Sequence, residues 1–241
     1  MTELCDHQQV GFANFMDVIT ARDFPCLGAR SAAATKSLSS SEGKSLLDTN
    51  SDRQVIGELE LFTATVKADQ TRLHSFVALY PETPVLTESA FETAIWGRLT
   101  ALQACEVALN IPAAENVEND PTHPSFALSF GGMGMFIVGV HPNASRPARR
   151  FPCAAIIFNP HDQFERLRTT GVYEKMRAKI LDRDLIFAGS QNPMIARYGE
   201  KSEAAQYSGR QVSDAWECPF PGRDTLTGPP PPFRPNATNN F

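Results

Sequence analysis

Apolar residues recur at helical spacing in two stretches of the first seventy residues. In residues 7–22 they stand at i, i+3, i+4 and i+7, which places them on one face of a helix. These residues are Phe12, Phe15, Met16 and Ile19. Pro25 disfavours helical backbone in the residue before it and ends the helix. Residues 52–68 carry the same period and predict a second helix.

Helix signals return later in the chain. Ser89 and Glu92 have the spacing of a capping box, in which each side chain bonds to the backbone of the other residue at a helix start. Gly171 breaks a later helical stretch into two parts, because glycine interrupts helix interiors. The helices predicted from these signals cover residues 89–109, 162–170 and 171–184.

Runs of apolar and β-branched residues predict strands between these helices. Four such runs are bounded by turn residues, and they cover residues 73–80, 126–130, 135–140 and 153–158. Gly131 and Gly132 suit a tight turn between the second and the third run, since glycine accepts positive φ. The pattern as a whole predicts an α+β fold with a mostly antiparallel sheet of about four strands and helices packed against it.

Polar and proline-rich stretches separate these elements. Residues 31–54 are rich in Ser, Ala, Lys and Asp and predict a mobile connection, and residues 114–124 predict an acidic loop. Four consecutive prolines at 229–232 indicate an extended tail. We therefore expect one domain over residues 1–220 and a disordered tail over residues 221–241.

Composition and charge narrow the classes of function. The chain has 241 residues and a net charge of -5, so no general basic field favours nucleic acid. Its first 22 residues lack the features of a signal peptide, and no apolar stretch approaches the roughly 20 residues of a membrane span. Five widely spaced cysteines without a CxxC pair predict free thiols. These features predict a cytoplasmic protein with neither a membrane nor a nucleic acid as partner.

Polar residues directly after two apolar strands are candidates for a site, because a sheet holds such residues rigidly at the edge of the core. His141 follows one strand and His161 the next. Each is a candidate metal or haem ligand, acid–base group or structural histidine. If the two strands form a hairpin, the two histidines lie near its opposite ends and do not bind the same ion.

A basic loop lies between these strands. Arg146, Arg149 and Arg150 are suited to hold carboxylates or phosphates through planar, bidentate donors, or they form a solvated loop. Cys26 and Cys218 each stand beside a proline and are either thiolate ligands of a haem iron or inert buried thiols.

Two turn-rich segments, residues 189–194 and 206–210, predict either a pocket lining or tight structural loops. The chain lacks a P-loop, a Rossmann glycine run and a GxSxG elbow, which disfavours nucleotide binding and serine hydrolase chemistry.

Six blocks in order resemble the YqcI/YcgG family, and the likeness covers roughly residues 12–220. The blocks are FPCLGARSA (24–32), GVHPNASRPARRF (139–151), FNPHDQFERLR (158–168), GSQNPM (189–194), GEKSEAAQYSGR (199–210) and WECPF (216–220). Members of this family with an assigned role resemble haem-dependent oxygenases that hydroxylate a guanidino nitrogen of arginine-like amino acids.

This resemblance implies a site built around haem b, with O2 and an external electron donor such as an unidentified reductase. Arg146, Arg149 and Arg150 are then candidates for holding the haem propionates or the substrate carboxylate. Glu165 and Glu203 are candidates for pairing with the guanidinium of the substrate. The candidates for the single axial ligand are His161 and His141, followed by Cys218 and Cys26.

Two other interpretations stay open. One is a non-catalytic, small-ligand-binding or stress-associated protein in which the arginines hold an anion. The other is a non-haem metal enzyme that uses His161, Asp162 and Glu165.

Overall fold

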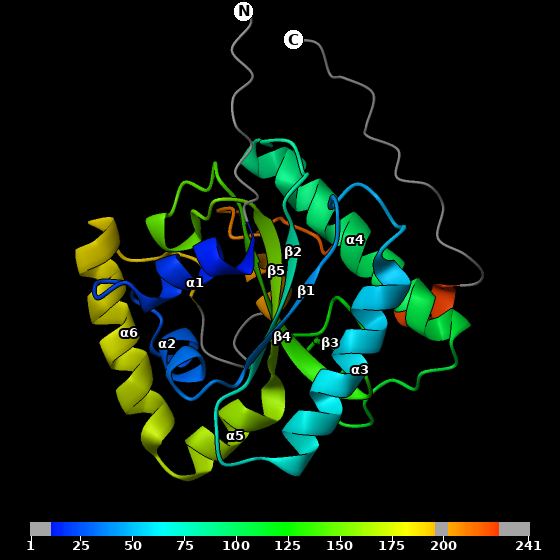
Figure 1. Ribbon diagram of the computed structural model, residues 1–241, viewed down its shortest axis with the longest axis horizontal. Coiled ribbons are helices and arrows are strands. Elements are labelled where there is room, and N and C mark those ends of the chain that lie inside the picture. Colours follow the sequence, from blue (N-terminus) through cyan, green and yellow to red (C-terminus); the bar gives the residue numbers. More distant parts are fainter. Residues whose placement is uncertain (1–10, 196–201, 227–241) are drawn as a thin grey trace, which may run out of the picture.

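A five-stranded sheet forms the centre of the molecule in the computed structural model, which describes residues 11–195 and 202–226 (Figure 1). The strand order is β1-β2-β5-β4-β3, with β1 parallel to β2 and all other neighbours antiparallel. The strands are β1 (Leu38–Glu42), β2 (Ser75–Tyr80), β3 (Leu128–Phe130), β4 (Met133–Val140) and β5 (Ala154–Pro160). The predicted α+β class and mostly antiparallel sheet are confirmed, with one strand more than expected.

Helices cover both faces of this sheet, with α1, α2 and α6 on one side and α3 and α4 on the other (Figure 1). The helices are α1 (Phe12–Thr20), α2 (Leu27–Ala34), α3 (Asp52–Ala68), α4 (Glu88–Ala108), α5 (His161–Thr169) and α6 (Val172–Ala188). α3 has the predicted bounds. α5 and α6 are separated at Gly171, whose φ of 69° is left-handed as the predicted break requires.

The expected mobile connection over residues 31–54 is wrong. It contains the end of α2, all of β1 and the start of α3. β1 pairs with β2 from Leu38 opposite Ser75 to Glu42 opposite Leu79. The sequence of β1, LSSSE, lacks an apolar alternation because β1 is an edge strand with largely exposed side chains, so backbone bonding to β2 defines it.

Two apolar clusters hold the layers together. The larger one lies between the sheet and α3 and α4, and it includes Phe62, Phe91 and Phe158. The smaller one lies on the other face under α1 and includes Phe15, Ile19 and Val77. All six residues of β2 are buried because both of its faces are covered, which explains why its sequence is apolar throughout.

The start of α4 differs from the predicted capping box. The helix begins at Glu88, and the side chain of Thr87 accepts a hydrogen bond from the backbone N–H of Ala90 at 3.2 Å. Glu92 is buried and instead accepts a hydrogen bond from Arg210, in the C-terminal segment (residues 202–226). The predicted glycine turn is present, with φ of 58° and 67° at Gly131 and Gly132.

The packed part of the chain extends past the predicted boundary at residue 220. Phe220 is only 4% exposed in the larger cluster. Arg223 lies in a short 3-10 turn (Arg223–Thr225) and donates to Glu106 at 2.9 Å and to Gln103 at 2.8 Å. The rest of the expected tail, residues 227–241, lies outside the described residues.

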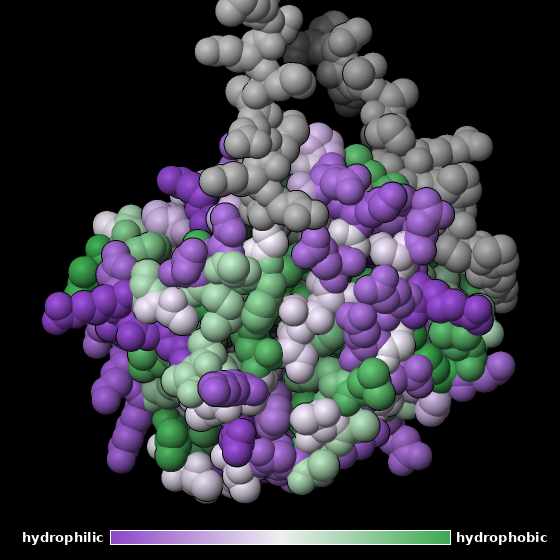
Figure 2. Space-filling model, viewed as in Figure 1, coloured by the Kyte–Doolittle hydropathy of each residue, from purple (hydrophilic) through white to green (hydrophobic). Residues whose placement is uncertain are grey.

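The outer surface is mixed in character. Groups of apolar side chains lie among hydrophilic ones on the face shown in Figure 2. None of the helices formed by residues 11–195 and 202–226 has the length and apolar character needed to cross a membrane.

Candidate functional site

His161 and Glu203 meet although 42 residues separate them in the sequence. His161 is the first residue of α5, directly after β5, and Glu203 begins a 3-10 turn (Glu203–Gln206). The imidazole Nε2 lies 3.1 Å from Oε2 of Glu203, with the two side chains only 12% and 16% exposed. A carboxylate bound to one ring nitrogen fixes the orientation of an imidazole, and a ligand histidine needs such an orientation.

A cavity of about 170 Å³ lies beside this pair. Its lining includes His161 and two carboxylates, Asp162 and Glu165. Asn116, which also lines the cavity, donates to Asp162 at 3.4 Å, and Arg168 forms an ion pair with Glu165. The structure therefore brings Glu203 next to His161 and Glu165, which share one segment of the sequence.

His161, Asp162 and Glu165 do not form a three-ligand metal site. Across the described ranges, 11–195 and 202–226, no three His, Cys, Asp or Glu side chains converge as a metal ion requires. The arrangement offers one imidazole beside carboxylates.

His141 lies at the other end of the same two strands. The pairing of Met135 with Pro160 and of Val140 with Ala155 separates it from His161, as the hairpin argument predicted. The ring is 2% exposed and is stacked on Phe91 with 4.1 Å between the ring centroids. Burial lowers the pKa of His141, so the ring is neutral near pH 7.

The two cysteine candidates lie in surroundings that raise the pKa of their thiols. Cys26 caps α2, where its Sγ accepts from the backbone N–H of Ala29 at 3.5 Å, and burial raises its pKa. Burial also raises the pKa of Cys218 to about 11. Burial therefore favours the neutral thiol of both cysteines while no metal is bound.

The three arginines of the basic loop bond mainly to the protein itself. Arg146 pairs with Asp184 at 2.5 Å. Arg149 is partly buried and donates to the carbonyl oxygen of Gly139 at 2.8 Å. Arg150 donates to the carbonyl oxygen of Ala144 at 3.1 Å. The bonds of Arg146 and Arg149 hold the loop against α6 and β4, whereas Arg150 is exposed and bonds within the loop.

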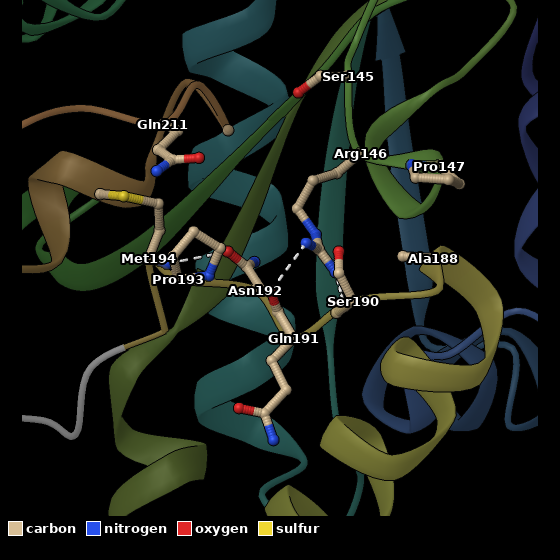
Figure 3. A pocket seen from close by; sticks show the side chains of 11 residues that line it. Ser145, Arg146, Pro147, Ala188, Ser190, Gln191, Asn192, Pro193, Met194 and Gln211 are labelled. Carbon is tan, nitrogen blue, oxygen red and sulfur yellow. Dashed lines mark hydrogen bonds between the residues drawn. The ribbon is translucent and has the colours of Figure 1, made fainter.

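A second cavity, of about 360 Å³, lies beside Arg146 (Figure 3). Three segments line it: residues 145–147, residues 188–194 and residues 209–211. Two of them fall in the turn-rich segments for which the sequence left a pocket and a structural loop open. Here they line a pocket.

Glu92 is a residue whose role the sequence pattern misassigned. Its carboxylate accepts from Nε of Arg210 at 2.7 Å and from the indole N–H of Trp216 at 3.1 Å. Its position next to Phe91, on the apolar stripe of α4, could have indicated that Glu92 is buried. A buried glutamate needs hydrogen-bond partners.

The protein thus belongs to the α+β class, with a mixed five-stranded sheet and an imidazole–carboxylate pair at the end of β5. The family model described as YqcI/YcgG family matches residues 15–221. The chain belongs to the YqcI/YcgG family. Searches of curated proteins and of solved structures found no match.

Proposed function

We propose that this protein is a haem-dependent oxygenase that hydroxylates a nitrogen of a guanidino or amino acid substrate, with His161 as the axial ligand. One observation carries the proposal: among the four candidate ligands, His161 lines a cavity next to Glu165 and is oriented by Glu203. The resemblance of YqcI/YcgG members with an assigned role to guanidino N-hydroxylases supports it.

The donor chemistry of this region fits a haem. Histidine is a common proximal ligand of haem iron, and a carboxylate on its second nitrogen increases its basicity. The cavity of about 170 Å³ is smaller than the roughly 300–1,000 Å³ of most ligand sites. The macrocycle does not fit into this cavity with its walls as they stand in the structure.

Bound haem would supply the activation of O2, with electrons from an external donor. The protein residues would then hold and orient the reactants. His161 would hold the iron, and Glu203, whose Oε2 lies 3.1 Å from Nε2 of His161, would fix the imidazole. Glu165 already binds a guanidinium, that of Arg168, and we propose that it accepts the guanidinium of the substrate in the same way.

The test is a visible spectrum of protein from haem-supplemented cells, with further haem added by titration. We expect a Soret band in the wild type and its loss in His161→Ala, with a reduced carbon monoxide spectrum typical of imidazole ligation. His123→Ala is the matched control, because His123 is exposed on the loop before β3 and its side chain accepts a hydrogen bond from the backbone N–H of Ser125, away from His161 in the sequence.

Three results contradict the proposal. One is the absence of a Soret band in the wild type after haem titration. Another is full haem retention by His161→Ala. The third is loss of haem in Cys26→Ala or Cys218→Ala alone, which would place the ligand on a thiolate.

A further inference from the structure

A proline-rich stretch, residues 227–235, follows directly after the packed part of the chain. Its sequence is TGPPPPFRP, with four consecutive prolines at 229–232 and one more at Pro235. The stretch lies outside the part of the chain that the structure describes, and its pattern is a property of the sequence. The proposed oxygenase function assigns no role to these residues.

Consecutive prolines favour one backbone conformation. The pyrrolidine ring fixes φ at about −65°, and helical backbone is disfavoured in a residue that precedes a proline. Both restrictions favour the polyproline II helix, which has three residues per turn and no internal hydrogen bonds. Because the prolines restrict the free chain to this conformation, a partner that binds it has little chain entropy to remove.

The period of three sorts the side chains of the proline-rich stretch onto three ridges. The first ridge consists of Pro229, Pro232 and Pro235. The second ridge consists of Gly228, Pro231 and Arg234. The third ridge includes Pro230 and Phe233. The first two ridges together give the spacing Pro-x-x-Pro-x-Arg, and PxxP segments dock in the aromatic-lined grooves of domains such as SH3.

Arg234 adds a charge requirement to this pattern. It is the one charged side chain in residues 227–241. It shares a ridge with Pro231, so a groove that receives the first two ridges also receives Arg234. A guanidinium binds a carboxylate through two parallel hydrogen bonds. The groove that fits this sequence therefore carries carboxylates at the end that receives Arg234.

The described part of the chain holds the base of the proline-rich stretch. Nη1 of Arg223 donates to Glu106 at 2.9 Å and to Gln103 at 2.8 Å, and the side chain of Arg223 is only 11% exposed. Leu226 packs against the larger apolar cluster. Pro229 follows three residues later, so it lies at most about 11 Å from Leu226. The fold therefore attaches the stretch at a fixed point near the end of α4.

A rigid spacer is the other common use of a proline-rich stretch. A spacer needs stiffness, but it does not need an arginine two residues after the second proline of a PxxP pattern. We infer that residues 228–235 bind a partner protein, in an aromatic-lined groove of the SH3 type whose acidic end binds Arg234. The inference does not depend on haem or on His161.

Binding of the full chain to a panel of purified SH3 domains, chosen because their ligands follow the PxxPxR pattern, tests the inference. In an NMR titration of the isotope-labelled domains, the chain should shift the amide signals of the aromatic groove in a saturable manner. Arg234→Ala should raise Kd by roughly 10–100-fold, because hydrogen bonds between charged groups are lost. Added salt should weaken binding of the wild type more than that of Arg234→Ala, since salt screens the ion pair.

Three further variants separate recognition of the ridges from general effects. Pro232→Ala removes a side chain from the first ridge and should raise Kd at least several-fold. Pro230→Ala changes the third ridge and should leave Kd nearly unchanged. Arg53→Ala, an exposed arginine of α3, is the control for loss of a positive charge. All four variants should keep the haem spectrum of the wild type, which separates this inference from the proposed oxygenase activity.

The inference is overturned if the full chain leaves the spectra of all the SH3 domains unchanged, or if Arg234→Ala binds as the wild type does. Equal weakening by Pro230→Ala and Pro232→Ala would show that the stiffness of the stretch matters rather than its ridges, and would overturn the groove assignment. Binding that depends on Arg234 and Pro232 but not on Pro230 or Arg53 would support it.

Discussion

Gly139 lies where α4 and the C-terminal segment press against β4. A Cβ at this position would lie 2.5 Å from Cδ1 of Ile95 and 2.8 Å from the carbonyl oxygen of Tyr207. Its backbone N–H also donates to that carbonyl oxygen at 2.7 Å. The absence of a side chain therefore allows a long-range contact, and φ at Gly139 lies outside the left-handed region.

Gly139→Ala should destabilise the protein by about 1–3 kcal/mol, because the added methyl group overpacks this contact. Gly57→Ala is the control: it lies within α3 with no atom within 4 Å of the added Cβ, and it should stabilise by about 0.5–1 kcal/mol. Urea denaturation measures both changes. Equal effects of the two substitutions would refute the packing argument.

At the scale of elements, two different segments bond to the outer edge of β4. β3 pairs with β4 only from Met133 to Met135. Beyond that point the segment around Tyr207 covers the edge, through its bond to Gly139 and a 3.5 Å bond from its hydroxyl to the carbonyl oxygen of Met135. Covered edges do not pair with other chains, so this segment protects the sheet.

Glu92 holds the segment around Tyr207 in place through its bonds to Arg210 and Trp216, and Glu92→Ala should release this segment. Loss of the charged bonds from Arg210 and Trp216 should cost about 2 kcal/mol and expose the segment. Limited trypsin digestion should then cleave faster after Arg210. Thr93→Ala, on the exposed side of α4, should leave the cleavage rate unchanged. An unchanged rate in Glu92→Ala would show that other contacts hold the segment.

At the scale of the whole molecule, buried carboxylates couple stability to pH. Burial raises the pKa of Asp52 to about 6 and that of Glu106 to about 7, against the opposing effects of Arg98 and Arg223. Both values lie above the ordinary ones, so the folded state binds these protons more tightly. Their contribution to stability is complete below about pH 4 and is lost as the pH rises through about 6 to 7. His141 has the opposite effect on stability. Because its pKa is lowered in the folded protein, its contribution to stability is present above about pH 6.5 and is lost as the pH falls.

Glu106→Gln should remove the part of this dependence that Glu106 causes. Relative to the variant, the wild type should lose unfolding free energy on the order of 3 kcal/mol between pH 5 and pH 8, since the pKa rises from 4.5 to about 7 on folding. Urea denaturation at both pH values measures the difference. A difference that does not change with pH would show that Glu106 stays ionised in the folded protein.

The elements with strong local signals were predictable. The apolar period of α3 gave its bounds, and the paired glycines gave the turn between β3 and β4. β1 was not predictable, because its polar sequence becomes a strand only beside β2. The cap of α4 was misassigned, because Ser89 and Glu92 match the capping-box pattern whereas the N-cap in the structure is Thr87, two residues earlier.

The candidate site was predictable only as a set of separate residues. The sequence by itself determined that His141 and His161 follow apolar strands and that the arginines share one loop, because these features depend on short local patterns. Only the tertiary structure decided that His161 meets Glu203, that Arg146 lies beside a cavity and that Glu92 holds the C-terminal segment. Each of these contacts joins segments at least 38 residues apart, and their positions depend on how the whole chain packs on the sheet.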